Sequence, residues 1–177
     1  MRITSNGFSL LELVVVVAII AILAALVIPN VTSEIQDAKQ TGTMHNIQEI
    51  AKVCVRYAAL NDEAPAAGLQ EGLLSPEGEF VATLRKNSLP NCPTKDNWGN
   101  PLLVYSGNAV AGYLGLPTEE AKATDILIIS NGRYNQPDSF RYDPAKPEAG
   151  KYKVKKDADY ANDLINLNGN WIRGPEK

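Results

Sequence analysis

An apolar run near the N-terminus constrains the fold of this chain more than any other feature. Between residues 8 and 28 the only polar side chains are Ser9 and Glu12, and residues 13–28 contain none. A helix of that length would extend roughly 30 Å at ~1.5 Å per residue, which is about the hydrocarbon thickness of a bilayer. The run therefore predicts a membrane helix with one unusual residue, the carboxylate of Glu12, close to its start.

The residues before this run predict a leader peptide. They are polar and carry one positive charge, Arg2, and the small residue Gly7 stands where the apolar run begins. A secretory signal peptide would place its small-residue cleavage site after a shorter apolar core. We therefore expect a leader of residues 1–7 to be removed, leaving the helix on the mature chain.

The motif at this boundary resembles a known family. Residues 7–13, Gly-Phe-Ser-Leu-Leu-Glu-Leu, with the apolar run and Pro29, are similar to the class III leader and N-terminal helix of type IV pilins and type II secretion pseudopilins. The resemblance implies that a prepilin peptidase cleaves after Gly7 and methylates the new N-terminus at Phe8. It also implies that Glu12 pairs with the Phe8 amine of a neighbouring subunit and that Pro29 softens the helix.

A physical argument supports a partner for Glu12. A carboxylate within a lipid-facing helix costs about 3 kcal/mol on insertion scales and normally has a partner. Cleavage after Gly7 would create one, the α-amine of Phe8. Alternatively, Glu12 stabilises the first turn through the helix dipole or reaches its own N-terminus. We expect the pairing between subunits, which would set the axial stagger of a filament.

The apolar periodicity continues beyond residue 30 but becomes narrower. Apolar positions recur at three- and four-residue spacing, at Val31, Ile35, Ala38, Ile47, Ile50, Ala51, Cys54, Val55 and Ala58. This spacing predicts an amphipathic helix with one buried stripe. We expect a single helix over about 8–60, kinked or loosened at Pro29 because proline removes one backbone donor.

The composition changes after Leu60, and the fold class follows from that change. Beyond it lie 10 of the 11 prolines and 11 of the 13 glycines, which exclude a second long helix. The pattern predicts a short helix at 79–86 and strands at 101–105, 110–116, 125–130, 139–142 and 151–156, with 125–130 central. The predicted fold is α+β: a long N-terminal helix packed on a small antiparallel sheet, as in type IV pilins. Residues 8–30 form its transmembrane or filament-core segment, and residues 31–177 form the head.

A second segment resembles type II secretion major pseudopilins. Residues 96–102, Asp-Asn-Trp-Gly-Asn-Pro-Leu, with Tyr105, are similar to that family's D-x-W-G-N-P-x-x-Y segment, although a tight turn with a buried indole would account for Trp98 as well. The resemblance implies a calcium ion in the loop after the central strand. Residues 130–138 lack the family's Asp-Gly, and Arg133 adds a positive charge, so we expect no cofactor. Calcium stays open because four carboxylates lie nearby in sequence: Asp138, Asp143, Asp159 and Asp163.

The two cysteines predict a disulfide. Cys54 lies on the predicted helix and Cys92 lies beyond it, and an even count in an exported domain favours a bridge. A bridge closing this loop would stabilise the fold by ~3–4 kcal/mol. The alternative is a buried free Cys54 with an unrelated Cys92.

The sequence carries no enzyme signature and no nucleic-acid footprint. It lacks C-x-x-C, H-E-x-x-H and G-x-S-x-G, and His45 is its only histidine. The formal charge of −3 argues against nucleic-acid binding. One basic cluster fits protection of a sheet edge better than contact with acidic subunits or DNA: Arg141, Lys146, Lys151, Lys153, Lys155 and Lys156.

Together these features predict a structural filament subunit, most like the major pseudopilin of a type II secretion system. The resemblance implies a homo-polymeric helical filament. Its partners would be the prepilin peptidase, an inner-membrane assembly platform, minor pilins or pseudopilins, and membrane lipid before assembly. Arg2 favours a cytoplasmic N-terminus and a periplasmic head on a single pass through the bacterial inner membrane. The alternatives are a type IV pilus pilin for adhesion, motility or DNA uptake, a single-pass anchored binding domain, and a membrane-tethered hydrolase.

Overall fold

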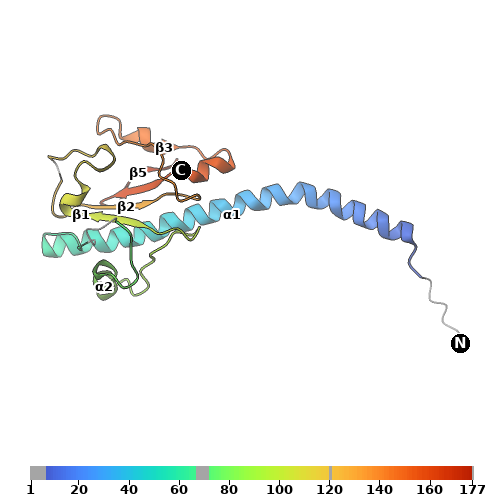
Figure 1. The fold of residues 1–177 in the computed structure, drawn as a ribbon, viewed down its shortest axis with the longest axis horizontal. Helices are drawn as coiled ribbons and strands as arrows, with labels where there is room; N and C mark the ends of the chain where they lie inside the picture. The colour runs from blue at the N-terminus through green and yellow to red at the C-terminus, as the bar shows by residue number, and fades with distance from the viewer. Residues whose placement is uncertain (1–6, 67–71, 120, 177) are drawn as a thin grey trace. The chain divides into compact units, whose positions relative to one another are not determined.

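A computed structural model describes residues 7–66, 72–119 and 121–176, without the side chains of residues 26–30 (Figure 1). The leader residues 1–6 and the side chain of Pro29 therefore lie outside the described part. The chain divides into two compact units, Met1–Asp37 and Ala38–Lys177. One helix, α1 (Leu10–Asn61), runs through both, as the continuous periodicity predicts.

In the second unit, α1 buries a stripe that faces the head. The stripe begins later than the sequence predicts, at Gln40, and continues through Thr43 to Ala58. Its buried apolar members are Ile47, Ile50, Ala51, Val53, Cys54 and Ala58. Val31 and Ile35 are exposed in the first unit, and Ala38 and Val55 are exposed in the second, so these four predictions were wrong. Spacing alone cannot show where along a helix the covering structure starts.

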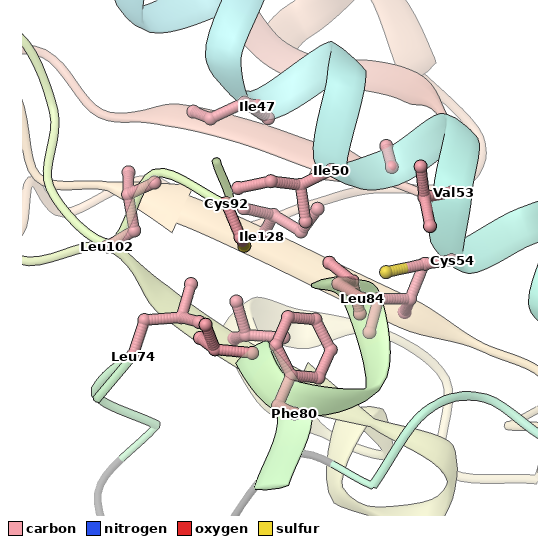
Figure 2. Close-up of a cluster of buried hydrophobic side chains, with 14 of the residues drawn as sticks. Ile47, Ile50, Val53, Cys54, Leu74, Phe80, Leu84, Cys92, Leu102 and Ile128 are labelled. Carbon is pink, nitrogen blue, oxygen red and sulfur yellow. The ribbon is translucent and has the colours of Figure 1, made fainter. Parts of the chain in front are cut away.

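The predicted short helix is present as α2 (Glu79–Lys86). It buries Phe80, Val81 and Leu84 and leaves its charged residues exposed, because its apolar residues recur at helical spacing. Figure 2 shows Phe80 and Leu84 entering the same cluster as Ile50 and Cys54 of α1.

The described residues of the head form a five-stranded sheet in the order β1-β2-β4-β5-β3. The strands are β1 (Leu103–Ser106), β2 (Ile126–Ser130), β3 (Lys151–Tyr152), β4 (Leu164–Leu167) and β5 (Asn170–Pro175). Strands β1, β2, β4 and β5 are antiparallel neighbours in that order, whereas β3 pairs in parallel with β5, so the sheet is mixed. The α+β class is confirmed, and the antiparallel prediction fails only at this short edge strand.

Two predicted strands are absent and two real strands escaped prediction. Residues 110–116 form parts of two 3₁₀ turns, where Gly112 and Gly115 adopt positive φ, and residues 139–142 form no strand. Strands β4 and β5 form a hairpin whose turn residues, Asn168 and Gly169, both have positive φ. Asn-Gly between two apolar runs is a strong hairpin signal, so this pair could have been predicted.

Apolar clusters cover both faces of the sheet. One joins α1 and α2 to Val104, Ile126, Ile128 and Leu164 (Figure 2), and the other gathers Val110, Leu116, Leu127, Ile129, Ile165 and Ile172. Alternate residues of β2 thus enter opposite clusters. This two-sided burial explains why its sequence is continuously apolar instead of alternating.

Candidate assembly and head-anchoring sites

The N-terminal unit presents apolar side chains on every side of α1. The large apolar residues from Phe8 to Leu23 are all exposed, with Val16 at 45% and Leu10 at 80% as the extremes. A helix that is apolar all round requires an apolar environment, either lipid or other helices. Within the described ranges, the structure contains no helix with an apolar stretch long enough to cross a membrane.

Glu12 forms part of a capping box at the start of this helix. Its Oε2 accepts a hydrogen bond from the Ser9 backbone N–H at 2.9 Å, and the Leu11 N–H donates to Ser9 Oγ at 3.2 Å. The pattern Ser-x-x-Glu is the sequence signature of this cap, and our sequence analysis missed it. In the single chain Glu12 thus accepts a hydrogen bond at the start of its own helix, close to the alternative in which it stabilises the first turn. The predicted pairing with Phe8 of a neighbouring subunit stays a prediction.

The segment with the D-x-W-G-N-P pattern forms a turn organised by a buried carboxylate. Asp96 is 5% exposed, and its Oδ1 accepts hydrogen bonds from the backbone N–H groups of Trp98 at 3.0 Å and Asn100 at 2.8 Å. Its Oδ2 accepts from the hydroxyl of Ser130, at the end of β2, at 2.8 Å. Asn100 extends the link by donating from Nδ2 to the Gly132 carbonyl at 2.8 Å.

The same turn docks on α1 at a glycine. The Asn97 N–H donates to Thr43 Oγ1 at 3.0 Å, and Asn46 Nδ2 donates to Asn97 Oδ1 at 3.1 Å. A Cβ on Gly42 would lie 2.1 Å from Asn97 Nδ2, so the missing side chain makes room for the turn. Gly42 and Thr43 are thus the point of α1 on which this turn docks.

Two of the four carboxylates considered for calcium lie together. The Asp138 N–H donates to Asp163 Oδ2 at 3.1 Å, and the Asp163 N–H donates to Asp138 Oδ2 at 3.3 Å. Asp163 is 2% exposed, and its Oδ1 has no hydrogen-bond partner. Burial, together with the nearby Asp138 charge, raises the pKa of Asp163 to about 7.

The other two carboxylates serve local turns. Asp143 Oδ1 accepts from the Ala145 N–H at 2.9 Å, and Asp159 Oδ2 accepts from the N–H groups of Lys155 and Lys156. These backbone hydrogen bonds lower the pKa of Asp159. Arg133 is ion-paired with Asp157. No group of three or more His, Cys, Asp or Glu side chains suited to a metal occurs in the described ranges.

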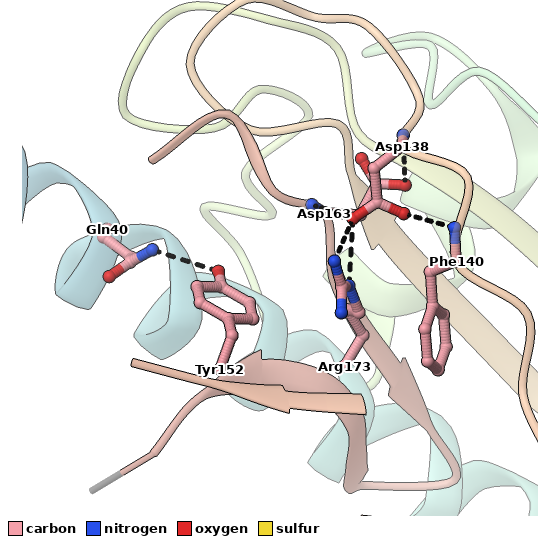
Figure 3. Close-up of polar contacts among 6 residues, drawn as sticks. All are labelled: Gln40, Asp138, Phe140, Tyr152, Asp163 and Arg173. Carbon is pink, nitrogen blue, oxygen red and sulfur yellow. Dashed lines mark hydrogen bonds and ion pairs between the residues drawn. The ribbon is translucent and has the colours of Figure 1, made fainter. Parts of the chain in front are cut away.

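The calcium ligand set implied by the resemblance does not fit these residues. The nearest positive group to the carboxylate pair is Arg173 of β5, which binds Asp138 Oδ2 through Nε at 2.9 Å and Nη2 at 2.5 Å (Figure 3). Calcium takes six to eight oxygens, commonly several of them anionic. Here one of the two adjacent carboxylates is already bound to a guanidinium, and Arg173 had no signal in the sequence analysis.

The two cysteines share the cluster between α1, α2 and the sheet, but both are free thiols in the structure (Figure 2). The predicted disulfide is therefore absent here. Burial raises the pKa of both thiols, that of Cys92 to about 11.

The remaining sequence candidates lie at the surface or at the sheet edge. His45 is exposed on α1. Of the basic cluster, Lys151 lies on edge strand β3 and donates to the Trp171 carbonyl at 2.8 Å, while Lys153 is ion-paired with Glu176 at 3.4 Å. Because β3 ends at Tyr152, only Lys151 of this cluster lies on an edge strand, so the edge-protection interpretation finds support at one residue and not along 151–156.

Comparisons with known proteins agree with both resemblances. Residues 3–28 match a family profile described as the prokaryotic N-terminal methylation motif. The chain is 36% identical to the type II secretion system core protein G of Pseudomonas aeruginosa over 99 residues, covering 54% of this chain and 70% of that one. It is 29% identical to the protein of the same name from Aeromonas hydrophila, covering 68% and 90%, and 25% identical to that from Dickeya chrysanthemi, covering 78% and 77%. No solved structure matches the chain significantly.

Proposed function

The chain belongs to the family of type II secretion system core protein G, and we propose that it serves as the major pseudopilin, the structural subunit of a helical secretion filament. The observation that carries this proposal is the apolar segment of α1, whose large side chains are exposed all round from Leu10 to Leu23, with Phe8 exposed just before it. Packing these faces against the same faces of other copies would remove them from water, at roughly 25 cal/mol per Å² of apolar surface buried.

We propose that maturation prepares this segment for assembly. The prepilin peptidase would cleave after Gly7 and methylate Phe8, which is part of the matched methylation motif. The subunit would then wait in the inner membrane, with its N-terminus cytoplasmic and its head periplasmic. An inner-membrane assembly platform would extract it into the filament with minor pseudopilins. The proposed role is mechanical and involves no catalysis.

Within the filament, we propose that Glu12 pairs with the methylated amine of Phe8 on a neighbouring subunit. In the single chain its Oε2 accepts one hydrogen bond, from the Ser9 N–H, while its side chain remains at an exposed position. A carboxylate has acceptor sites to spare after one such bond, so it can cap its own helix and bind a second cation. An ammonium and a carboxylate buried among apolar helices would attract strongly, and this attraction would favour one axial register.

Separating the two roles of Glu12 provides the test. Glu12→Ala removes the proposed pair together with the cap bond from the Ser9 N–H, whereas Ser9→Ala removes the other cap bond, from the Leu11 N–H, and keeps the carboxylate. Both variants are expressed in a strain lacking the chromosomal copy. Membrane insertion, pseudopili seen by electron microscopy and exoproteins in the medium are then measured.

We expect Glu12→Ala to insert normally but to form no pseudopili and to leave exoproteins in the periplasm, while Ser9→Ala assembles. Equal defects in both variants would reduce Glu12 to a helix cap. Loss of surface pili with normal exoprotein secretion would overturn the secretion role itself.

A further inference from the structure

Arg173 occupies the centre of a site that joins distant parts of the head. Its guanidinium binds Asp138 and lies 4.8 Å from the ring centroid of Phe140 and 5.2 Å from that of Tyr152 (Figure 3). Such contacts with aromatic faces stabilise a cation as its water is removed. The Tyr152 hydroxyl in turn accepts a hydrogen bond from Gln40 of α1 at 3.2 Å.

Through these contacts Arg173 connects several elements of the head, which is the role of a structural metal ion. Asp138 lies within the loop that follows β2, Tyr152 belongs to edge strand β3, and Arg173 belongs to β5. Reciprocal hydrogen bonds with Asp163 connect the same cluster to the start of β4. One guanidinium therefore ties a long loop to three strands, as a bound divalent ion often does.

The hydrogen bonds of Asp138 leave little room for a metal. Its Oδ2 accepts from Arg173 Nε, Arg173 Nη2 and the Asp163 N–H, and its Oδ1 accepts from the Phe140 N–H at 2.7 Å. A carboxylate oxygen has two lone pairs, so Oδ2 is saturated. A divalent ion at this carboxylate would have to displace the guanidinium and would meet its charge at short range.

We propose that Arg173 is the built-in cation of this carboxylate pair and replaces the calcium ion implied by the family resemblance, so that the head folds without calcium. The proposal does not depend on filament assembly. It departs from the resemblance at the same loop whose sequence lacks the family's Asp-Gly. The unpartnered Oδ1 of Asp163 is the strongest argument for a metal, but the adjacent carboxylate of Asp138 is already ion-paired with a fixed positive charge, Arg173.

Thermal unfolding of the full-length protein in detergent tests this directly, with Trp98 and Trp171 as fluorescent reporters. The melting temperature of the wild type is measured in excess EGTA and in millimolar calcium, and calcium binding is measured by calorimetry. Arg173→Gln is compared with Arg141→Gln, a matched change at an exposed arginine. Arg173→Gln/Asp138→Asn removes both charges of the pair.

We expect the wild type to melt at the same temperature in both solutions and to bind no calcium. Arg173→Gln should lower the melting temperature by about 6 °C or more, because it leaves a half-buried carboxylate uncompensated. The double variant should recover part of that loss, and Arg141→Gln should match the wild type.

A saturable calcium-dependent rise in the wild-type melting temperature would overturn the proposal, and this measurement stands even if Arg173→Gln does not fold. Equal effects of Arg173→Gln and Arg141→Gln would also overturn it.

Discussion

The turn around Asp96 offers a quantitative test of what fixes the head to α1. Asp96→Ala removes the acceptor of three hydrogen bonds, from the backbone N–H groups of Trp98 and Asn100 and from the Ser130 hydroxyl. Hydrogen bonds to a charged group contribute roughly 1.5–3 kcal/mol each. The site is only 5% exposed, but water can reach part of the cavity left by truncation, so we expect a loss of about 3–5 kcal/mol.

Asp96→Asn separates hydrogen bonding from charge. The asparagine Oδ1 can still accept from both backbone N–H groups, and its Nδ2 can donate to Ser130 Oγ. The serine hydroxyl then loses its acceptor, so this variant should lose about 1–2 kcal/mol. Asp143→Ala, which removes a single exposed turn bond to the Ala145 N–H, should cost less than about 1 kcal/mol.

Urea unfolding followed by tryptophan emission measures all three free energies. The slope of free energy against urea concentration should stay constant, which shows that the unfolded states are comparable. A loss below about 1 kcal/mol for Asp96→Ala would refute the reasoning, because it would mean that water replaces these bonds without penalty. Equal losses for Asp96→Ala and Asp96→Asn would refute it as well, since charge and not bond count would then decide.

Three further predictions concern the head. Thr43→Val should cost about 1–2 kcal/mol in the same urea assay, because it leaves the Asn97 N–H without its acceptor. The raised pKa of Asp163 means that the folded head binds a proton that the unfolded chain releases, so stability should fall as pH rises from about 4 to about 7. Asp163→Asn should flatten that dependence in melting temperatures measured across the range, and an unchanged slope would assign it to other groups. Cys54 and Cys92 should react with a thiol reagent only after unfolding, since both are buried with raised pKa values. If the unfolded protein instead reacts only after a reductant is added, the two cysteines form the disulfide.

Local periodicity predicted the elements whose burial follows from their own sequence. The spacing of apolar residues indicates which faces are buried in three elements: the stripe of α1, the helix α2 and the strand β2, which is buried on both faces. Strands β4 and β5 were missed because polar residues interrupt them, although the Asn168-Gly169 turn between them was visible.

The sites were harder to predict because they depend on contacts between residues far apart in the chain. Nothing near Arg173 in the sequence indicates that Asp138, 35 positions earlier, will meet it. The parallel pairing of β3 has the same origin, since the direction of a strand is set by the path of its connection and not by its two residues. The role of Gly42 follows only from the approach of Asn97.

The continuity of α1 has a consequence for a subunit under load. The helix that exposes its apolar surface from Leu10 to Leu23 also supplies Ile47, Ile50 and Cys54 to the core of the head, without an intervening loop. A pull on the N-terminal segment therefore reaches that core directly, with no slack chain to extend first. How long a head endures such a pull is set by its unfolding rate, not by its equilibrium stability. Interactions that form late in folding, after the transition state, would lengthen that lifetime most.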